Sequence, residues 1–361
     1  MKIVGLITEY NPLHNGHLYH FNEVKKKTNA DLFVLVMSSS FTMRGDLSIF
    51  NKFIKTRQAL DLGIDLIIEL PFVYSVERAD IFSLNAVKIL NLLNVNEIWI
   101  GSENNDISLY EKYYNESINI DNSTSFNTSY KNKSNLDLLS NDLLGYFYYK
   151  AIKDNNYNIK LNTIKRIDNN YLDNNLVNSD IQSANAIRNN LNELDKYTPN
   201  FVSKDINNIL DENKLFIFLK YKILSETPNN LKNIFFVDEG IEYKLKDIIN
   251  YNNLNNYIDY LSNKRYSKTR IKRMLMYILF NITKDVINKI YQDDINYIRV
   301  LGYTNIGKEY LNKMKKNINI YTNIKEGIND ILDIEIKISK NLDNIYNTNI
   351  FNLEQKGPIT K

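Results

Sequence analysis

Short apolar runs alternate with segments in which apolar residues recur at helical spacing through the first half of the chain. Runs bounded by turn residues are typical of buried strands, and apolar residues at every third or fourth position indicate amphipathic helices. The pattern predicts strands at 3–7, 32–36, 66–69, 98–100 and 161–166. It predicts helices at 17–27, 52–62, 79–93, 143–153 and 183–191. This alternation favours an α/β fold with a parallel sheet and helices on both faces.

Strand signals mostly vanish after Thr198, Pro199 and Asn200, where proline and the residue before it both resist helix. Helical spacing continues at 215–224, 245–261, 269–282 and 307–314. A length of 361 residues suits two units, since domains hold roughly 150 residues each. We therefore expect a Rossmann-like, parallel-sheet domain over residues 1–195 and a mainly helical domain over residues 200–361.

Composition excludes several kinds of chemistry and of location. The chain has no cysteine, so disulfides, thiolate zinc sites, iron–sulfur clusters and cysteine nucleophiles are ruled out. Hydrophobic residues make up 43% of the chain, enough for a substantial core. No apolar run approaches the roughly 18 residues of a membrane span, and Glu9 interrupts the apolar N-terminal stretch. We expect a cytoplasmic protein without a membrane partner.

The charge balance allows only a local nucleic-acid site, because 45 Lys and Arg oppose 42 Asp and Glu. One basic patch, KRYSKTRIKR at 264–273, contains no acidic residue, and Tyr266 offers a ring that could stack on a base. The candidate RNA-binding residues are Lys264, Arg265, Lys268, Arg270, Lys272 and Arg273. A solvated charged face is the open alternative.

All three histidines of the chain lie within EYNPLHNGHLYH, directly after the first expected strand. Pro12 sets a turn, Gly16 permits close backbone approach, and His17 begins the expected helix. Free N–H groups and the helix dipole attract phosphate to such a helix start, and imidazoles add directional donors. The segment therefore predicts an anion site.

Two other interpretations of the histidines stay open, a metal site and purely structural side chains. The spacing suits a metal poorly, and Glu9 is the one carboxylate at a matching position. Neither GxxxxGK[ST] nor a GxGxxG after a strand is present, which removes the main support for P-loop and dinucleotide-oxidoreductase functions.

The motif HNGH at 14–17 resembles the HxGH signature of the nucleotidyltransferase superfamily. The segment QSANAIR at 182–188 is similar to its second signature, and the two occur in the right order. The wider chain resembles the bacterial tRNA(Met) cytidine acetate ligases, through GLITEYNPLHNGHLYH, MSSSFTMRGD, GIDLIIELPFVYS, SNDLLGYFYYKAI, DEGIEY and KRYSKTRIKRMLMYIL. The resemblance implies ATP-dependent activation of acetate and acetylation of N4 of the wobble cytidine in elongator tRNA(Met).

Three positions depart from that family pattern. Asn185 stands where Thr is usual, Ser39-Ser40 where Gly-Asn is frequent, and Asp168-Asn169 where a glycine-containing turn is common. The amide of Asn185 can still hydrogen-bond a phosphate, so the implied activity is retained.

The resemblance also implies roles for single residues. His14 and His17 would stabilise charge on the α-phosphate, and Arg188 would hold the β- and γ-phosphates through its fork of donors. A Mg²⁺ ion bridging the phosphates is expected, although no acidic cage is readable and no protein metal site is predicted. The implied ATP-binding residues are Ile7, Thr8, Glu9, Tyr10, Asn11, Pro12, Leu13, His14, Asn15, Gly16, His17, Leu18, Tyr19, His20, Gly101, Asn141, Arg166, Ile167, Ser183 and Arg188.

Some of these assignments keep an ordinary structural alternative. Gly101 after a strand suits a plain turn, and Asn141 suits a helix N-cap. For Arg44 and Lys52 we expect contact with either acetyl-adenylate or RNA, and the sequence does not distinguish the two.

Two competing functions remain at the level of sequence. A small-molecule adenylyltransferase of cofactor biosynthesis would use the same HxGH chemistry but would need only the first domain. The helical half argues for a large acceptor, although oligomerisation would explain it too. A non-catalytic RNA-binding protein is the other alternative, and exchange of pyrophosphate into ATP would separate it from both enzymes.

Overall fold

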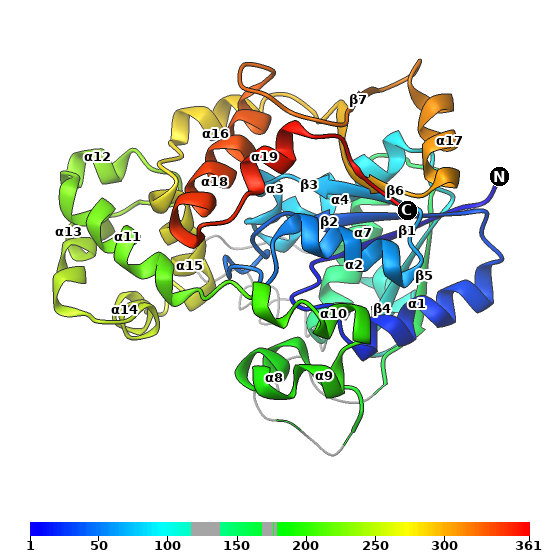
Figure 1. The fold of residues 1–361 in the computed structure, drawn as a ribbon, viewed down its shortest axis with the longest axis horizontal. Coiled ribbons are helices and arrows are strands. Elements are labelled where there is room, and N and C mark those ends of the chain that lie inside the picture. Colours follow the sequence, from blue (N-terminus) through cyan, green and yellow to red (C-terminus); the bar gives the residue numbers. More distant parts are fainter. Residues whose placement is uncertain (117–137, 168–175, 177–178) are drawn as a thin grey trace.

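A central sheet organises the computed structural model, which describes residues 1–116, 138–167, 176 and 179–361. Its strand order is β5-β4-β1-β2-β3-β6-β7, and β8 pairs with β6 (Figure 1). The strands are β1 Ile3–Thr8, β2 Leu32–Ser38, β3 Leu66–Leu70, β4 Glu97–Ser102, β5 Lys160–Lys165, β6 Tyr297–Tyr303, β7 Asn319–Tyr321 and β8 Ile359–Thr360.

The first five strands are parallel to one another, which confirms the α/β fold with a parallel sheet. Every residue of β2 and of β3 is buried. Strands covered on both faces carry continuous apolar sequences, and this explains why their short runs were readable from the sequence. All five strands expected in the first half are present.

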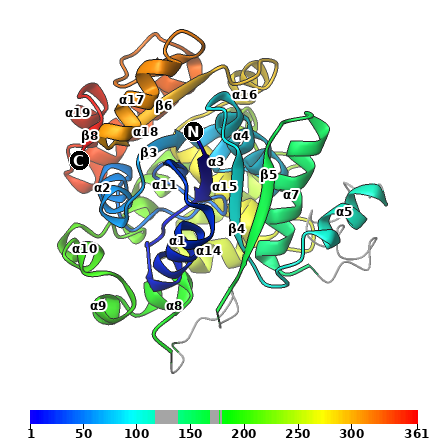
Figure 2. The same ribbon diagram turned by 90° about the vertical axis from the view of Figure 1, so that its right-hand side faces the viewer.

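Helices cover both faces of this sheet. Figure 2 shows α1 (Asn15–Thr28) and α2 (Lys52–Leu62) on one face and α4 (Ala79–Leu92) and α7 (Ser140–Asp154) on the other. Shorter helices are α3 Phe72–Ser75, α5 Ser108–Asn115 and α8 Ala184–Asn189. The five expected helices are confirmed, with boundaries that differ by a few residues.

The strand order reverses beside β1, which lies between β2 and β4. In open parallel sheets, ligands bind at the carboxyl edge where the order reverses, because the crossover helices diverge there and leave a crevice. The loops after β1, β4 and β5 meet at this edge, so the topology points to a site beside the HNGH segment.

Helices dominate the chain from about residue 194 to residue 290, and most of them form the cluster at the left of Figure 1. They are α9 Leu194–Tyr197, α10 Asn200–Ser203, α11 Asn213–Ser225, α12 Pro228–Lys232, α13 Ile241–Lys244, α14 Leu254–Leu261, α15 Lys268–Leu279 and α16 Lys284–Ile290. The single helix expected at 245–261 is wrong. This range holds two elements, a 3₁₀ turn at Leu245–Asn250 and the helix α14. The Asn253 side chain caps α14 by accepting a hydrogen bond from the Asn256 N–H.

The last part of the chain is mainly helical, as expected, but it also returns to the central sheet through β6, β7 and β8, which the pattern did not predict. Strand β6 pairs antiparallel with β3, and α17 (Asn305–Met314), α18 (Asp330–Tyr346) and α19 (Ile350–Gln355) follow it. The pattern hid β6 because Arg299, 1% exposed, lies in its middle. A domain boundary near residue 195 stays a prediction.

Lys52 lies at the centre of a buried ion cluster that joins this return to the first helices. Its Nζ lies 2.6 Å from Glu69 on β3 and 3.1 Å from Glu335 on α18, and it also pairs with Glu354 on α19. Arg299 on β6 reaches Glu354 at 3.1 Å. Burial and the nearby Glu335 raise the pKa of Glu69 to about 8, and the charge of Lys52 opposes this rise.

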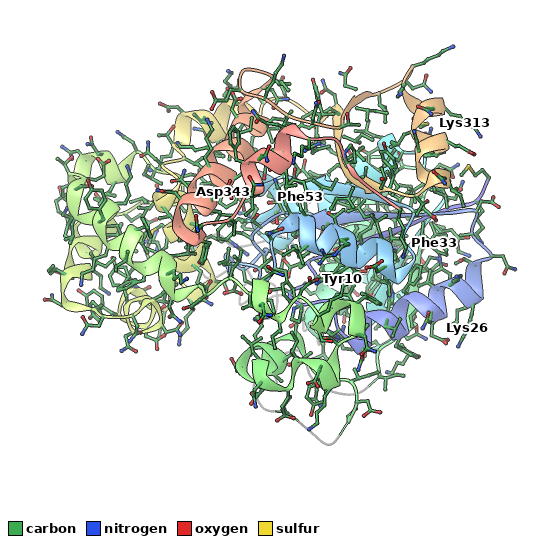
Figure 3. The ribbon with its side chains drawn as sticks, in the orientation of Figure 1. Tyr10, Lys26, Phe33, Phe53, Lys313 and Asp343 are labelled. Atoms are coloured by element: carbon green, nitrogen blue, oxygen red, sulfur yellow. The ribbon has the colours of Figure 1, made fainter. Side chains whose placement is uncertain are left out.

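No helix in the described ranges is long and apolar enough to cross a membrane. The outer edge of the molecule carries charge instead, and Figure 3 shows Lys26 on α1 and Lys313 on α17 pointing outward there. The cytoplasmic location stays a prediction.

Replacing Lys52 with methionine should lower the free energy of unfolding by about 3–5 kcal/mol, because it leaves buried carboxylates without their cation. Urea titration at pH 7 measures this change. Lys204→Met is the control, since Lys204 forms an exposed pair with Asp61 at 3.6 Å whose loss should cost under about 1 kcal/mol. Equal, small losses in the two variants would contradict the organising role of the cluster.

Candidate functional site

A cavity of about 220 Å³ opens at the carboxyl edge of the sheet, between the ends of β1, β4 and β5 and the start of α1. The expected site residues that line it are Ile7, Thr8, Glu9, Tyr10, Asn11, His14, Gly16, His17, Tyr19, His20, Gly101, Asn141, Arg166, Ile167, Ser183 and Arg188. Pro12, Leu13, Asn15 and Leu18 are not among the lining residues. Asn15 instead donates to the backbone of Asp180 and Lys196.

His14 and His17 cap α1 reciprocally. The Nδ1 of His14 accepts from the Gly16 N–H at 3.1 Å, and the Nδ1 of His17 accepts from the His14 N–H at 3.2 Å. A neutral imidazole whose Nδ1 accepts carries its proton on Nε2. The two rings lie 3.9 Å apart, so both Nε2–H donors belong to one small region of the cavity.

This capping corrects the expected start of the helix. The helix begins at Asn15, and His14 is its N-cap and is buried, with 7% of its surface exposed. The N–H groups of His14 and Gly16 already have partners. The hydrogen-bond donors expected for an anion at this helix start are therefore mainly the imidazole N–H groups and not free backbone N–H groups.

Gly16 is required by the position of the His14 ring. A Cβ added at Gly16 would lie 2.8 Å from His14 Cε1 and 3.0 Å from its Nδ1. Any other residue would push the ring out of its cap, so the glycine of HNGH serves side-chain packing as well as backbone approach.

All three histidines are held in the neutral form. Burial lowers the pKa of His14 to about 3, and the charges of Arg166 and Arg188 act in the same direction. Burial also lowers the pKa of His17 and brings that of His20 to about 4. The site therefore offers neutral hydrogen-bond donors whose protonation does not change near pH 7.

Arg188 of the QSANAIR segment reaches the same region from α8. Its guanidinium donates to the Asn11 carbonyl at 2.7 Å and to Asn185 Oδ1 at 3.2 Å. Asn185, which departs from the family pattern, thus orients the expected phosphate-binding arginine. Ser183 caps α8 by accepting from the Ala186 N–H at 3.0 Å.

The opposite wall comes from β4, β5 and α7. The side chain of Arg166 lies over Gly101, where a Cβ would meet its Cγ at 3.4 Å. Asn141 lies inside the first turn of α7, whose N-cap is Leu139, so the N-cap alternative for Asn141 is wrong. Its side chain donates to Glu103, which lies 3.9 Å from Arg166.

Sequence reasoning missed part of the wall, above all the loop after β2. Thr42, Met43 and Asp46 line the cavity together with Arg44, for which contact with substrate or RNA was expected. Other missed lining residues are Phe82, Trp99, Ile100, Ser140, Leu144, Tyr148, Ile164, Lys165, Ile181, Gln182 and Ala184. The loop was foreseeable, since β2 ends at the same sheet edge as β1.

Lys52 and Lys55 cannot contact substrate or RNA, because both side chains are fully buried. Lys52 belongs to the ion cluster. Lys55 donates to the carbonyls of Glu9 at 3.0 Å and Ser38 at 2.9 Å, and burial lowers its pKa to about 7. It thereby ties the ends of β1 and β2 together beneath the cavity.

The basic patch of residues 264–273 divides into two groups. Lys264, Arg265 and Lys268 are exposed, as expected for RNA contact. Tyr266 is 5% exposed, its hydroxyl donates to the Asp238 carbonyl, and Arg270 covers its ring at 4.3 Å, so its expected stacking on a base is wrong.

Lys272 and Arg273 contact the loop after β2. Lys272 pairs with Asp46, and Arg273 donates to the Met43 carbonyl at 2.7 Å. Both therefore contact the loop that lines the cavity, and the phosphate contacts expected for them stay a prediction.

Ser39-Ser40 and Asp168-Asn169 are the two other departures from the family pattern. Ser39 and Ser40 are buried at the base of the loop after β2, where the Ser40 carbonyl accepts from the Ser48 N–H. Asp168 and Asn169 lie outside the described residues.

Charge at the cavity favours an anionic ligand. Among the described lining residues, Arg44, Lys165, Arg166 and Arg188 are cationic, against the carboxylates of Glu9 and Asp46. Burial raises the pKa of Glu9, while the hydrogen bond from Met43 and the charges of Arg44 and Lys55 oppose the rise. Within the described ranges, no three His, Asp or Glu side chains gather as a metal-binding group.

Comparison with known proteins shows similarity over nearly the whole chain. Residues 1–357 match the family described as HIGH Nucleotidyl Transferase. A tRNA(Met) cytidine acetate ligase of Staphylococcus aureus (strain JH9) is 37% identical over 334 residues, 87% of each chain.

Two solved structures of Thermotoga maritima TmcAL cover 100% of this chain and 99% of their own. The apo form I has 25% identity and a TM-score of 0.85, and form II, bound with alpha-thio ATP, has 24% and 0.83. The likeness supports the mixed sheet and its helices.

Lowering the pH from about 6.5 to 4 should destabilise the fold. The unfolded histidines take up protons below about pH 6.5, whereas the folded ones stay neutral, so stability falls as the pH falls. His14→Asn keeps a cap acceptor and removes one such proton, so its stability should fall less steeply, by about 1.4 kcal/mol per pH unit. Urea unfolding of both proteins from pH 7 to 4.5 tests this, and parallel curves would refute a neutral His14.

Proposed function

We propose that this chain, which belongs to the HIGH nucleotidyltransferase family and to the tRNA(Met) cytidine acetate ligases within it, activates acetate as acetyl-adenylate. It then acetylates N4 of the wobble cytidine in elongator tRNA(Met). The observation that carries the proposal is the pair of neutral imidazoles at the start of α1, which share a cationic cavity with Arg166 and Arg188.

The first step is attack by an acetate oxygen on the α-phosphorus of ATP, with pyrophosphate as the leaving group. Acetate is ionised at neutral pH, so the difficulty is the approach of one anion to another. Preorganised donors that meet the developing charge supply most of such catalysis. The Nε2–H groups of His14 and His17 serve the α-phosphate, and Arg188, fixed by Asn11 and Asn185, serves the outer phosphates.

ATP would extend from these donors toward β4 and β5. Gly101, Arg166 and Asn141 form that wall, together with the apolar side chains of Trp99 and Ile164. A flat, largely apolar base suits such a surface. The similar Thermotoga maritima structure with alpha-thio ATP supports a nucleotide in this fold.

A Mg²⁺ ion is expected to accompany the ATP phosphates, as in most phosphoryl-transfer enzymes. The two cavity carboxylates are engaged, Glu9 by the Met43 N–H and Asp46 by Lys272. The side chains therefore do not fit an ion caged by protein, and the steps proposed here use only residues of the chain.

In the second step the cytidine amine attacks the acetyl carbonyl and AMP leaves. The chain has no cysteine, so the acetyl group cannot wait on the protein as a thioester. The adenylate must stay in the cavity until tRNA arrives. The exposed basic side chains of the 264–273 segment support a tRNA-binding surface. Arg265 pairs with Glu239 and Lys268 pairs with Asp259, and such exposed ion pairs are weak enough to exchange for phosphates.

His14→Ala and His17→Ala should each reduce acetate-dependent exchange of pyrophosphate into ATP by about 10²-fold, the effect of losing one transition-state donor. The unsubstituted chain should also form acetyl hydroxamate from ATP, acetate and hydroxylamine without tRNA. Circular dichroism verifies that the variants stay folded. Near-normal exchange in a folded variant, or a requirement for acetyl-coenzyme A, would contradict the scheme.

Charge reversal at Lys264, Arg265 and Lys268 should weaken tRNA binding and lower its log–log salt slope by roughly 0.7–0.9 for each lost phosphate contact. Cytidine acetylation should fall while acetate-dependent exchange continues, because none of the three lines the cavity. The matched control reverses Lys313, Lys315 and Lys316, which are equally exposed near the end of α17. Equal tRNA affinity in the two triple variants would return the patch to a solvated charged face.

A further inference from the structure

The segment Thr42–Asp46, called the 42–46 hairpin below, is a tight turn between β2 and α2. The Thr42 N–H donates to the Asp46 carbonyl and the Gly45 N–H donates to the Thr42 carbonyl, both at 2.9 Å. Four of its five residues, all but Gly45, line the cavity. The turn therefore presents Arg44, the cation of this wall, from a short element that needs support from behind.

Helix α15 supplies that support. Arg273 Nε donates to the Met43 carbonyl at 2.7 Å, and Lys272 pairs with Asp46. Gly45 lies directly on the α15 backbone: a Cβ there would be 2.7 Å from the Arg273 nitrogen and 2.8 Å from the Lys272 carbonyl carbon. Its φ of +84° is also one that other residues rarely adopt.

The hairpin is held from the cavity side as well. The Met43 N–H donates to Glu9 Oε1 at 2.5 Å, and Lys55 holds the Glu9 carbonyl. Arg273 thus binds the backbone carbonyl of Met43, and Glu9 binds its backbone N–H. A continuous set of hydrogen bonds runs from α15 through the hairpin to the end of β1.

The charge of Glu77 compensates that of the half-buried Arg273. Burial lowers its pKa, while Glu77 opposes the shift, so a guanidinium stays protonated here. Its alignment with a backbone carbonyl is therefore a charge-assisted hydrogen bond, stronger than a neutral one.

We propose that Arg273 is a positioning residue for the carboxylate co-substrate: it fixes the 42–46 hairpin so that Arg44 faces acetate. This inference rests on the proposed function. The hairpin wall lies beside β1 and β2, whereas the nucleotide wall lies on β4 and β5, so the two co-substrates depend on different elements. A carboxylate approaching ATP needs a cation on its own side, and Arg44 is that cation.

The proposal also changes what the basic segment does. Lys272 and Arg273 serve the cavity wall, while Lys264, Arg265 and Lys268, in and just before the first turn of the same helix, remain on the surface. The start of α15 and the residues just before it then carry the candidate tRNA contacts, while Lys272 and Arg273, one turn further on, support the site of acetate activation.

The test measures KM for acetate and KM for ATP separately, in acetate-dependent exchange of pyrophosphate into ATP, with the full chain. Arg273→Met and Gly45→Ala both free the hairpin, one by removing its donor and one by pushing it off α15. Each should raise KM for acetate about tenfold or more, the size expected for one charge-assisted hydrogen bond, with KM for ATP changed less than about twofold. Arg273→Lys keeps a cationic donor and should recover part of the loss.

Lys284→Met is the matched control, because Lys284 also donates to a backbone carbonyl, that of Val237 at 2.8 Å, away from the cavity. It should leave both KM values unchanged. Thermal unfolding verifies each variant, and loss of folding in both Arg273→Met and Gly45→Ala would assign the contact to stability alone and overturn the proposal.

Equal changes in the two KM values, or no recovery in Arg273→Lys, would also overturn it. Absence of acetate-dependent exchange in the unsubstituted chain would instead contradict the proposed function itself, and this inference with it.

Discussion

The buried charge of Lys52 is the constraint on which the rest of the structure depends. Its three carboxylates come from β3, α18 and α19, so the first residue of α2 joins the start of the chain to its end. A buried cation must be paired, because removing it from water without partners costs several kcal/mol. Three residues on, the same helix places Lys55 under the ends of β1 and β2, so the ion cluster and the floor of the cavity share one rigid element.

At the cavity itself, helix capping and electrostatics act on the same two rings. The cap orients His14 and His17 and assigns their protons to Nε2, while burial and the neighbouring Arg166 keep both neutral. A site that must receive several phosphates gains from donors that are fixed beforehand, because no reorganisation is then needed when charge develops. The positive charge of the cavity comes from Arg44, Lys165, Arg166 and Arg188 instead.

Much of the site could be predicted from the sequence because its signals are local. The histidine segment after the first strand indicates anion binding by itself, and Arg188 was identified because its segment resembles the second signature of the superfamily. The structure brings both to one cavity. The loop of Thr42–Asp46 lies in the segment MSSSFTMRGD, which resembles the family but carries no signal for anion binding of its own. It joins the site because β2 ends beside β1 and because α15, more than 220 residues later, packs against its back.

The sequence by itself determined the five parallel strands, their helices and the chemistry of the histidine segment, since apolar periodicity and local turns are properties of neighbouring residues. Only the tertiary structure decided which basic residues are free to meet a ligand. Lys52, Lys272 and Arg273 read as surface charges in the sequence, and each is neutralised or aligned by a partner far away in the chain. It also decided that Arg299 belongs to a strand, because a charge can occupy a buried position when Glu354 compensates it, and periodicity cannot foresee that partner.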